Sequence, residues 1–239
     1  MPYFLTESEL LLNVPTEVTG DEFSHLKSAH RINIGEDVTL QDPSGHRFIC
    51  KVSKIEKRSV VCIPYAKAKI PRDPKLAVSI FCAYINEPSL NLIIQKSTEL
   101  GAHSISIFRS KRSQPLGALA VKLIRWNKIA REAAKQCGRQ TPPGIEFVED
   151  ICKVLALDNK IKSIFGLELG GEHHDAQIHP LSSPSALIVG PEGGFDNEEL
   201  RIFRQLPGYS PLTLGNFTLR SETAVIAGLS VLYALAKEF

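Results

Sequence analysis

The stretch Leu214-Gly-Asn-Phe-Thr-Leu-Arg-Ser-Glu-Thr-Ala-Val-Ile-Ala227 has the pattern of a loop that enters a helix. Its first two residues are expected to close an apolar strand, and the small and apolar residues that follow predict a helix to about Lys237. Ser221 is the expected N-cap, and Glu222 in the first turn suits the positive end of the helix dipole. Arg220 and Glu222 are charged residues at the mouth of an otherwise apolar element, which makes them candidate functional residues.

A second loop of this kind, Ile188-Val-Gly-Pro-Glu-Gly-Gly-Phe195, lies upstream in the sequence. It leaves a predicted strand at Ser185–Val189 and enters a helix in which Asp196 is the expected cap and Glu199 completes a capping box. The loop lacks the lysine of a phosphate-binding P-loop and the spacing of a dinucleotide fingerprint. Two such loops are expected side by side at the carboxyl edge of one sheet, where open α/β folds bind ligands.

The chain before these loops alternates predicted strands with predicted helices. Strands are expected at Val78–Ala83, Ser104–Phe108 and Lys162–Leu169, and helices at Leu90–Leu100 and from about Gly117 to Cys137. This alternation predicts an α/β fold with a mainly parallel sheet that is covered by helices on both faces.

The longer of these helices combines an apolar face with a basic surface. The apolar face is expected to hold Ile124, Ile129, Ala130, Ala133 and Ala134, with Trp126 close by, and the remaining surface Arg125, Lys128, Arg131, Lys135 and Arg139. Residues 95–140 contain ten Lys/Arg and two acidic residues, whereas residues 141–239 contain seven and thirteen. The asymmetry predicts a polyanion that docks on the basic segment, and a simple solvated helix face carries about equal weight.

The first 66 residues have the pattern of a small β-rich module. A strand, a turn and a strand are predicted over Val38–Val52, a further strand at Val60–Ile63, and a short helix at Asp21–Ala29. The proline-rich segment Pro64–Pro74 is interpreted as a linker. We therefore expect a β-barrel domain at residues 1–70 and an α/β domain at residues 75–239.

Composition excludes several classes of protein. Hydrophobic residues make up 43% and charged residues 23% of the 239 residues, as in ordinary globular proteins. No stretch approaches the ~20 apolar residues of a membrane span, and the N-terminus lacks the charge pattern of a signal peptide. Five cysteines without close pairs, and histidines without regular spacing, indicate neither a disulfide framework nor a metal site, so we expect a cytoplasmic protein.

The candidate site residues also have purely structural interpretations. The glycine loop after Val189 could be a tight turn without a ligand. Arg220 could hold a carboxylate or phosphate in bidentate geometry, or could simply pair with Glu192 or Glu222. Glu222 could accept a proton, although on chemistry alone its effect on the helix dipole is the better explanation.

Four ordered motifs nevertheless carry a specific resemblance. They are Gln95–Ala102, Glu132–Arg139 followed by Pro142-Pro143, Val189–Gly194 and Leu214–Ala224. Together they closely resemble the bacterial 16S ribosomal RNA uridine-N3 methyltransferases, members of the SPOUT or α/β-knot superfamily. The resemblance covers nearly the whole chain, and the residues from His25 to Gly45 resemble the PUA-like barrel of that family.

The resemblance implies a C-terminal domain with a deep trefoil knot that binds S-adenosylmethionine and pairs two chains into a homodimer. The implied reaction is methylation of N3 of one uridine in the decoding region of 16S ribosomal RNA, on the small ribosomal subunit. The implied cofactor-binding residues are Leu167, Leu169, Val189, Gly190, Pro191, Glu192, Gly193, Gly194, Leu214, Gly215, Asn216, Leu219 and Arg220. The chain departs from the family at Asn216-Phe-Thr218, where the usual sequence is Pro-Arg-Ile or Pro-Arg-Val.

Methyl transfer to uridine N3 requires an unpaired base and loss of the N3 proton. We hypothesise that Arg220 stabilises the charge that develops on the uracil oxygen and that Glu222, or a water that it orders, accepts the proton. Phosphate contacts are expected from a set of basic residues, namely Arg31, Lys96, Arg109, Arg112, Arg131, Lys135 and Arg139. Two alternatives remain: methylation of another nucleotide or a ribose hydroxyl, and an RNA-binding assembly factor with a vestigial pocket.

Overall fold

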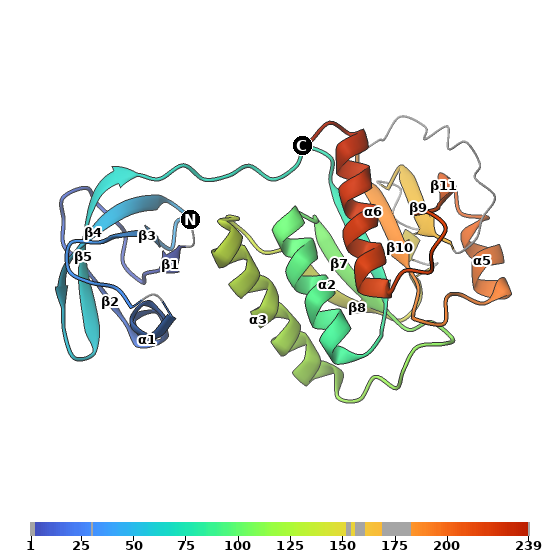
Figure 1. The fold of residues 1–239 in the computed structure, drawn as a ribbon, viewed down its shortest axis with the longest axis horizontal. Helices are drawn as coiled ribbons and strands as arrows, with labels where there is room; N and C mark the ends of the chain where they lie inside the picture. The colour runs from blue at the N-terminus through green and yellow to red at the C-terminus, as the bar shows by residue number, and fades with distance from the viewer. Residues whose placement is uncertain (1–2, 30, 152–153, 156–160, 169–182, 239) are drawn as a thin grey trace. The chain divides into compact units, whose positions relative to one another are not determined.

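The computed structural model describes residues 3–29, 31–151, 154–155, 161–168 and 183–238. The chain forms two compact units, which are described separately (Figure 1). The first comprises Met1–Arg72 with Ala134–Gln140, and the second comprises Asp73–Ala133 with Thr141–Phe239. None of the helices in the described residues is long and apolar enough to cross a membrane.

The first unit is built on a five-stranded sheet and one helix, α1 (Gly20–Ala29). The strand order is β1 (Phe4–Leu5), β3 (Asp37–Gln41), β4 (Arg47–Ile55), β5 (Ser59–Lys67), β2 (Thr16–Thr19). β1 runs parallel to β3 and the other pairs are antiparallel. Buried apolar side chains such as Leu26, Leu40 and Val60 form one core, so the expected barrel-like module is confirmed.

The predicted linker begins too early. Pro64 to Lys67 belong to β5, because the strand continues through the first proline. Pro64 pairs with Cys50 beside a register shift between Ile49 and Cys50. A proline cannot donate a ladder hydrogen bond, and an irregularity of this kind lets a strand accommodate one.

The second unit contains a six-stranded sheet in which every pair of neighbours is parallel. Its order is β11 (Tyr209–Leu212), β9 (Ser163–Leu167), β10 (Ser185–Val189), β6 (Val78–Ala83), β7 (Ser104–Phe108), β8 (Gly144–Val148). Its helices are α2 (Glu87–Leu100), α3 (Leu119–Cys137, from Ala134 grouped with the first unit), α5 (Asn197–Phe203) and α6 (Ser221–Leu235). The predicted parallel sheet is confirmed, whereas β8 was missed because its sequence, Gly-Ile-Glu-Phe-Val, lacks a continuous apolar run.

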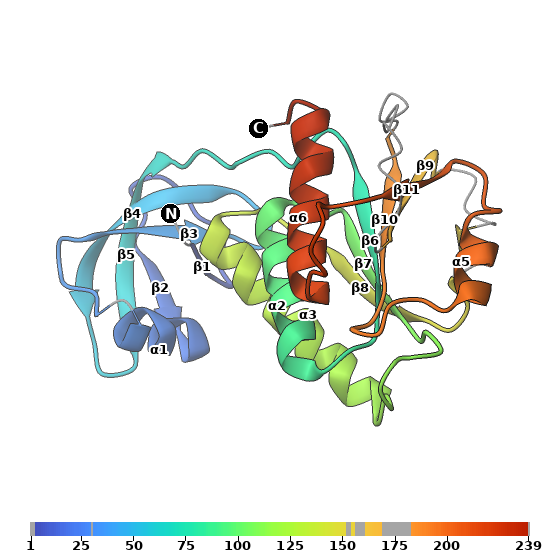
Figure 2. The same cartoon turned by 45° about the vertical axis from the view of Figure 1, so that its right-hand side comes forward.

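The central strands are buried on both faces, which explains their unbroken apolar sequences. In β6, Ile80 and Cys82 belong to the core under α2, α3 and α6, whereas Phe81 and Ala83 belong to the core on the opposite face. Phe203 of α5 belongs to this second core. Figure 2 shows α2, α3 and α6 on one face of the sheet and α5 on the other. Helices on both faces were expected, and the structure confirms them.

The predicted apolar face of α3 is partly wrong. Trp126 and Ala130 are fully buried and Ala133 is nearly so, as expected, but Ile124 is 71% exposed. Trp126, Ala130 and Ala133 follow the helical spacing of one face. Ile124 lies two residues, or about 200°, from Trp126 and therefore points in nearly the opposite direction.

Gly166 makes room for the Tyr209 ring of the neighbouring edge strand β11. A Cβ atom at this glycine would lie 2.0 Å from the hydroxyl of Tyr209 and 2.6 Å from Cζ of the same ring. The Tyr209 hydroxyl donates to Oε1 of Glu168 at 2.7 Å, so the ring cannot move without disturbing that bond. Gly166 therefore provides the space for a contact that ties β11 to the carboxyl end of β9.

We expect Gly166→Ala to lower the free energy of unfolding by about 1–3 kcal/mol, because the added methyl group overpacks a site that cannot relax without losing a hydrogen bond. The matched control is Gly144→Ala at the exposed start of β8, where no atom lies within 4 Å of the added methyl. The control is expected to change the free energy by less than about 1 kcal/mol. Urea unfolding of both variants tests this, and equal effects would contradict the packing argument.

Candidate active site

A pocket of about 800 Å³ lies at the carboxyl ends of three neighbouring strands, β9, β10 and β11. Three segments that follow these strands form most of its wall: Leu167–Glu168, Val189–Phe195 and Leu212–Leu219. The remaining lining residues are Arg112, Leu200, Arg204, Ser221 and Ala224. The two loops from which the sequence analysis began therefore meet at one site.

β6 and β10 are neighbours in the sheet. After β6 the chain continues towards one edge of the sheet, to β7, and after β10 it continues towards the other edge, to β11. Such switch points are the usual ligand sites of open α/β sheets. Asn86, which follows β6, donates from Nδ2 to Oε1 of Glu192 at 2.8 Å. Its Oδ1 accepts from the Ser89 backbone at 3.0 Å and so caps α2. One asparagine therefore fixes both the start of α2 and the glycine loop.

The glycine loop is shaped by the ring of Phe195. A Cβ atom on Gly190 would lie 3.2 Å from this ring, so glycine allows the two to pack closely. The ring stacks on Phe108 with centroids 6.3 Å apart and meets Phe203 edge-on at 4.9 Å. This aromatic cluster supports the loop from the sheet side and leaves its backbone facing the pocket.

Ser221 does not cap α6, which corrects the prediction. The N-cap is Arg220, whose side chain makes no capping bond. The Ser221 hydroxyl instead donates to the Gly190 carbonyl at 3.0 Å, and the residue is 4% exposed. This buried hydrogen bond joins the loop after β10 to the loop after β11.

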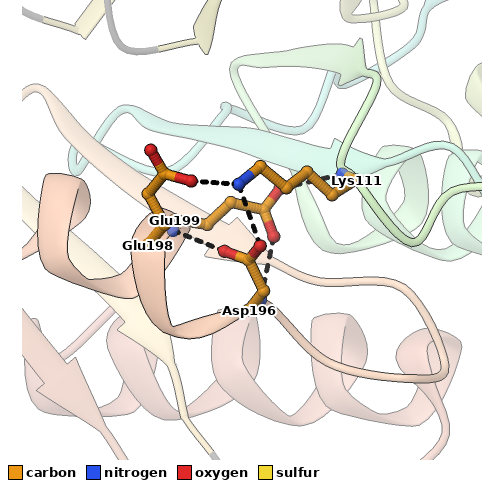
Figure 3. Close-up of polar contacts among 4 residues, drawn as sticks. All are labelled: Lys111, Asp196, Glu198 and Glu199. Atoms are coloured by element: carbon orange, nitrogen blue, oxygen red, sulfur yellow. Dashed lines mark hydrogen bonds and ion pairs between the residues drawn. The ribbon is translucent and has the colours of Figure 1, made fainter.

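The loop after β7 is tied to the start of α5, which directly follows the glycine loop (Figure 3). The Lys111 ammonium contacts Asp196 at 3.0 Å and also pairs with Glu198, and its backbone N–H donates to Glu199 at 3.0 Å. The expected capping box is present, since Asp196 and Glu199 each accept the other's backbone N–H, at 2.7 and 2.9 Å. The Glu199 N–H and then Lys111 lower the pKa of Asp196, which keeps the cap ionised.

Arg112, the next residue, reaches the pocket itself. Its guanidinium donates to the Gly193 carbonyl, and its side chain lines the pocket while remaining exposed. The Lys111 contacts hold the backbone next to it. Arg112 is thus a positively charged group fixed at the rim of the pocket.

A buried carboxylate forms another part of the wall. The Glu168 side chain is 6% exposed, accepts from the Tyr209 hydroxyl at 2.7 Å and from Arg204 Nε at 3.2 Å, and pairs with Arg204 Nη2. Burial opposes ionisation of Glu168, but the bonds from Arg204 and Tyr209 outweigh it and lower its pKa. Burial, and then the bond to Glu168, raise the pKa of Tyr209. The charge of Arg204 is therefore balanced within the wall.

Most of the expected cofactor-binding residues line this pocket. Eleven of them do so: Leu167, Val189, Gly190, Pro191, Glu192, Gly193, Gly194, Leu214, Gly215, Asn216 and Leu219. Leu169 lies outside the described residues, and Arg220 does not line the pocket. Phe195, Phe217, Ser221 and Ala224 also line the pocket, which the sequence motifs did not predict. Their nearness in sequence to the two loops was the available signal.

The expected catalytic pair lies beside the pocket. Arg220 is exposed and Glu222 is half-buried at the start of α6, and neither lines the pocket. Both flank Ser221, whose hydroxyl reaches Gly190. The structure thus places the pair at the exit of the second loop, as expected, and outside the pocket wall.

The expected RNA-binding residues fall into two groups. Arg31, Arg109, Arg112 and Arg131 are exposed, while Lys96 is half-buried and pairs with Glu99 at 2.9 Å. Lys135 and Arg139 were wrongly placed on an open surface. The Lys135 side chain is 13% exposed and pairs with Glu22, and Arg139 is 8% exposed. The Arg139 carbonyl accepts from Arg47 at 2.8 Å, which holds this segment within the first unit.

Comparison with known proteins gives several matches. The chain is 28% identical to the ribosomal RNA small subunit methyltransferase E of Bacillus subtilis, over 95% of this chain and 93% of that protein. A Legionella pneumophila protein solved with bound S-adenosylmethionine matches with a TM-score of 0.80 and 28% identity over 97% of this chain and 96% of that one. A ribosomal RNA small subunit methyltransferase E of Neisseria gonorrhoeae has the same fold, with a TM-score of 0.83 at 24% identity and 98% coverage of each chain.

These likenesses confirm the expected fold class, a SPOUT α/β-knot unit preceded by a PUA-like barrel. The model of an RNA methyltransferase PUA domain matches residues 18–65. The model of an RNA methyltransferase domain matches residues 72–233, well over half of the sequence. On this evidence the chain belongs to the RNA methyltransferase family that the second model describes.

Proposed function

We propose that this protein transfers a methyl group from S-adenosylmethionine to N3 of one uridine in the decoding region of 16S ribosomal RNA. The observation that carries the proposal is the pocket at the ends of β9, β10 and β11, which brings together eleven of the expected cofactor-binding residues. The name of the Bacillus subtilis relative and the cofactor bound in the Legionella structure support it. The proposed substrate is the assembled small ribosomal subunit.

The pocket suits this cofactor in size and chemistry. Its volume of about 800 Å³ lies within the range of small-molecule sites. Gly190 and Gly193 leave the loop backbone accessible, and Leu167, Leu212 and Leu214 supply apolar wall for an adenine ring. Within the described residues, no group of three or more His, Cys, Asp or Glu could hold a metal ion.

In this proposal the bound cofactor supplies an electrophilic methyl group. The S–CH₃ bond breaks as the N3–CH₃ bond forms, and the N3 proton must leave the uracil. Arg220 would stabilise the negative charge on the neighbouring carbonyl oxygen. Glu222, directly or through a water, would accept the proton. Their place at the start of α6, beside the loop that lines the pocket, supports these roles.

The proposal extends to the partners and the domains. Residues 1–70 would serve as an RNA-binding domain and residues 75–239 as the methyltransferase domain, and two chains would pair through the knot in the cytoplasm. The exposed Arg125, Lys128 and Arg131 on α3 would contact phosphates. The resemblance and the basic surface of α3 support these assignments.

Calorimetric titration tests the cofactor site. We expect micromolar binding of S-adenosylmethionine, weakened at least about tenfold by Ala224→Leu, because the larger side chain occupies part of the pocket. Thr223→Leu is the matched control, since its neighbouring position is exposed and outside the pocket. Absence of binding by the unaltered protein, or equal affinities of the two variants, would contradict the assignment.

Nucleoside analysis of small subunits treated with the protein and S-adenosylmethionine should reveal 3-methyluridine. Arg220→Ala should reduce the rate by roughly 10²–10³-fold, as for loss of one transition-state donor. Cofactor affinity should persist because Arg220 does not line the pocket. The control is Arg201→Ala, which replaces an exposed arginine on α5 and should methylate at nearly the rate of the unaltered protein.

Each of the other outcomes of these experiments would favour a specific alternative. A methylated ribose or another methylated base would favour a different target nucleotide. Cofactor binding without transfer to any ribosomal RNA would favour the assembly factor. Full activity of Arg220→Ala would remove Arg220 from the mechanism.

Salt dependence tests the basic surface of α3. The logarithm of the association constant for a 16S ribosomal RNA fragment should fall linearly with the logarithm of the salt concentration. Arg131→Gln should make this slope less steep by about 0.7–0.9, which is the contribution of one phosphate contact. Arg201→Gln on the opposite face of the sheet should leave the slope unchanged. An unchanged slope for Arg131→Gln would exclude this phosphate contact.

A further inference from the structure

Phe217 is the most exposed large hydrophobic side chain in the part of the chain that the structure describes, at 86%. Isolated apolar residues on a surface are common and need no explanation by themselves. Phe217 differs in its position, because it lines the pocket. The other exposed large hydrophobic residues, such as Ile124 on α3, do not line it.

The sequence neighbours of Phe217 do not form an apolar patch. Asn216 and Thr218 on either side are polar and exposed, and Gly215 before them has φ +80° with open space around its Cα. A stable protein interface buries about 800 Å² on each partner, which one ring among polar neighbours does not provide. The ring therefore suits a small planar partner better than a protein surface.

The loop also lacks charge. None of Asn216, Phe217 and Thr218 is basic, so this part of the rim cannot hold a phosphate by ion pairing. What it presents is an aromatic face at the opening of the pocket. Stacking on such a face is the common way in which proteins hold an unpaired base.

We propose that Phe217 is a stacking platform for a nucleobase of the RNA at the mouth of the pocket. This inference rests on the proposed function, in which the base is the extruded uracil. A uracil that presents N3 to the pocket has left its base pair and its stack. The ring of Phe217 replaces the stacking that the base has lost and keeps the plane of the base parallel to the ring.

Fluorescence tests stacking without any need for catalysis. The chain contains one tryptophan, Trp126, which is fully buried. Phe217→Trp adds an exposed indole, and we expect an octamer of uridylate to quench it, whereas an octamer of abasic ribose phosphate does not. Leu235→Trp is the control, because Leu235 is 46% exposed at the far end of α6, about 16 Å along the helix from Ala224 of the pocket.

Several results would overturn the proposal. Equal quenching by both octamers would indicate phosphate binding alone, and no quenching would indicate no contact. Quenching that grows with protein concentration in the absence of RNA would show that a second copy of the chain covers the ring.

Kinetics provide the second test. Phe217→Ala should lower kcat/KM for the small subunit by about ten- to a hundredfold, within the range for loss of one stacked base. Phe217→Tyr should restore most of it, because the tyrosine ring can stack in the same way. Full kcat/KM of Phe217→Ala would overturn the proposal.

The two proposals fail in different ways. An unaltered protein that transfers no methyl group, while the uridylate octamer still quenches Phe217→Trp, would refute the proposed function and retain the stacking site. An active unaltered protein, with full activity of Phe217→Ala and no quenching, would refute the stacking site and retain the function.

Discussion

The hydrogen bond from the Ser221 hydroxyl to the Gly190 carbonyl joins two loops that are 31 residues apart in sequence. The loop after β11 leaves the edge of the sheet, and α6 then packs against β10, two strands further in. The chain must therefore cross the end of the intervening strand β9, and the bond fixes where it does so. Because the Ser221 side chain is buried, removing it would leave a carbonyl without its partner. The pocket walls depend on this crossing.

The remaining contacts hold the glycine loop before any ligand arrives. Asn86 binds Glu192 at one side, Arg112 binds the Gly193 carbonyl at another, and the Phe195 ring supports Gly190 from the sheet. Each contact comes from the end of a different strand or its following segment. Loops fixed in this way lose less conformational entropy on binding, so more of the contact energy appears as affinity. A glycine-rich loop, flexible in isolation, thus becomes a defined surface.

The sequence predicted those features that depend on local pattern. The apolar runs of β6 and β10 and the capping box of Asp196 follow from neighbouring residues, and all are confirmed. The predictions were wrong for residues whose environment is set by a partner that lies far away in the sequence. Arg139 resembled a surface residue because nothing nearby shows that Arg47, 92 positions away, binds its carbonyl. Ser221 likewise has the composition of an N-cap, and only the fold reveals Gly190 as its partner.

The charges around the pocket explain what its mouth can recognise. The charge of Arg204 is balanced by the buried Glu168, and the stretch from Gly215 to Thr218 has no charge. Among the described residues of the pocket wall, Arg112 is therefore the exposed basic side chain that has no acidic partner in that wall. A mouth with so little positive charge selects poorly among phosphates. In the proposed function, attraction of the RNA would then depend on the exposed arginines of α3, outside the pocket. Selection at the pocket has to rely on shape and on planar contact. In the proposed function this division would assign affinity to the surface and the capture of an unpaired base to the pocket, and an aromatic ring at the rim suits the second task better than another cation.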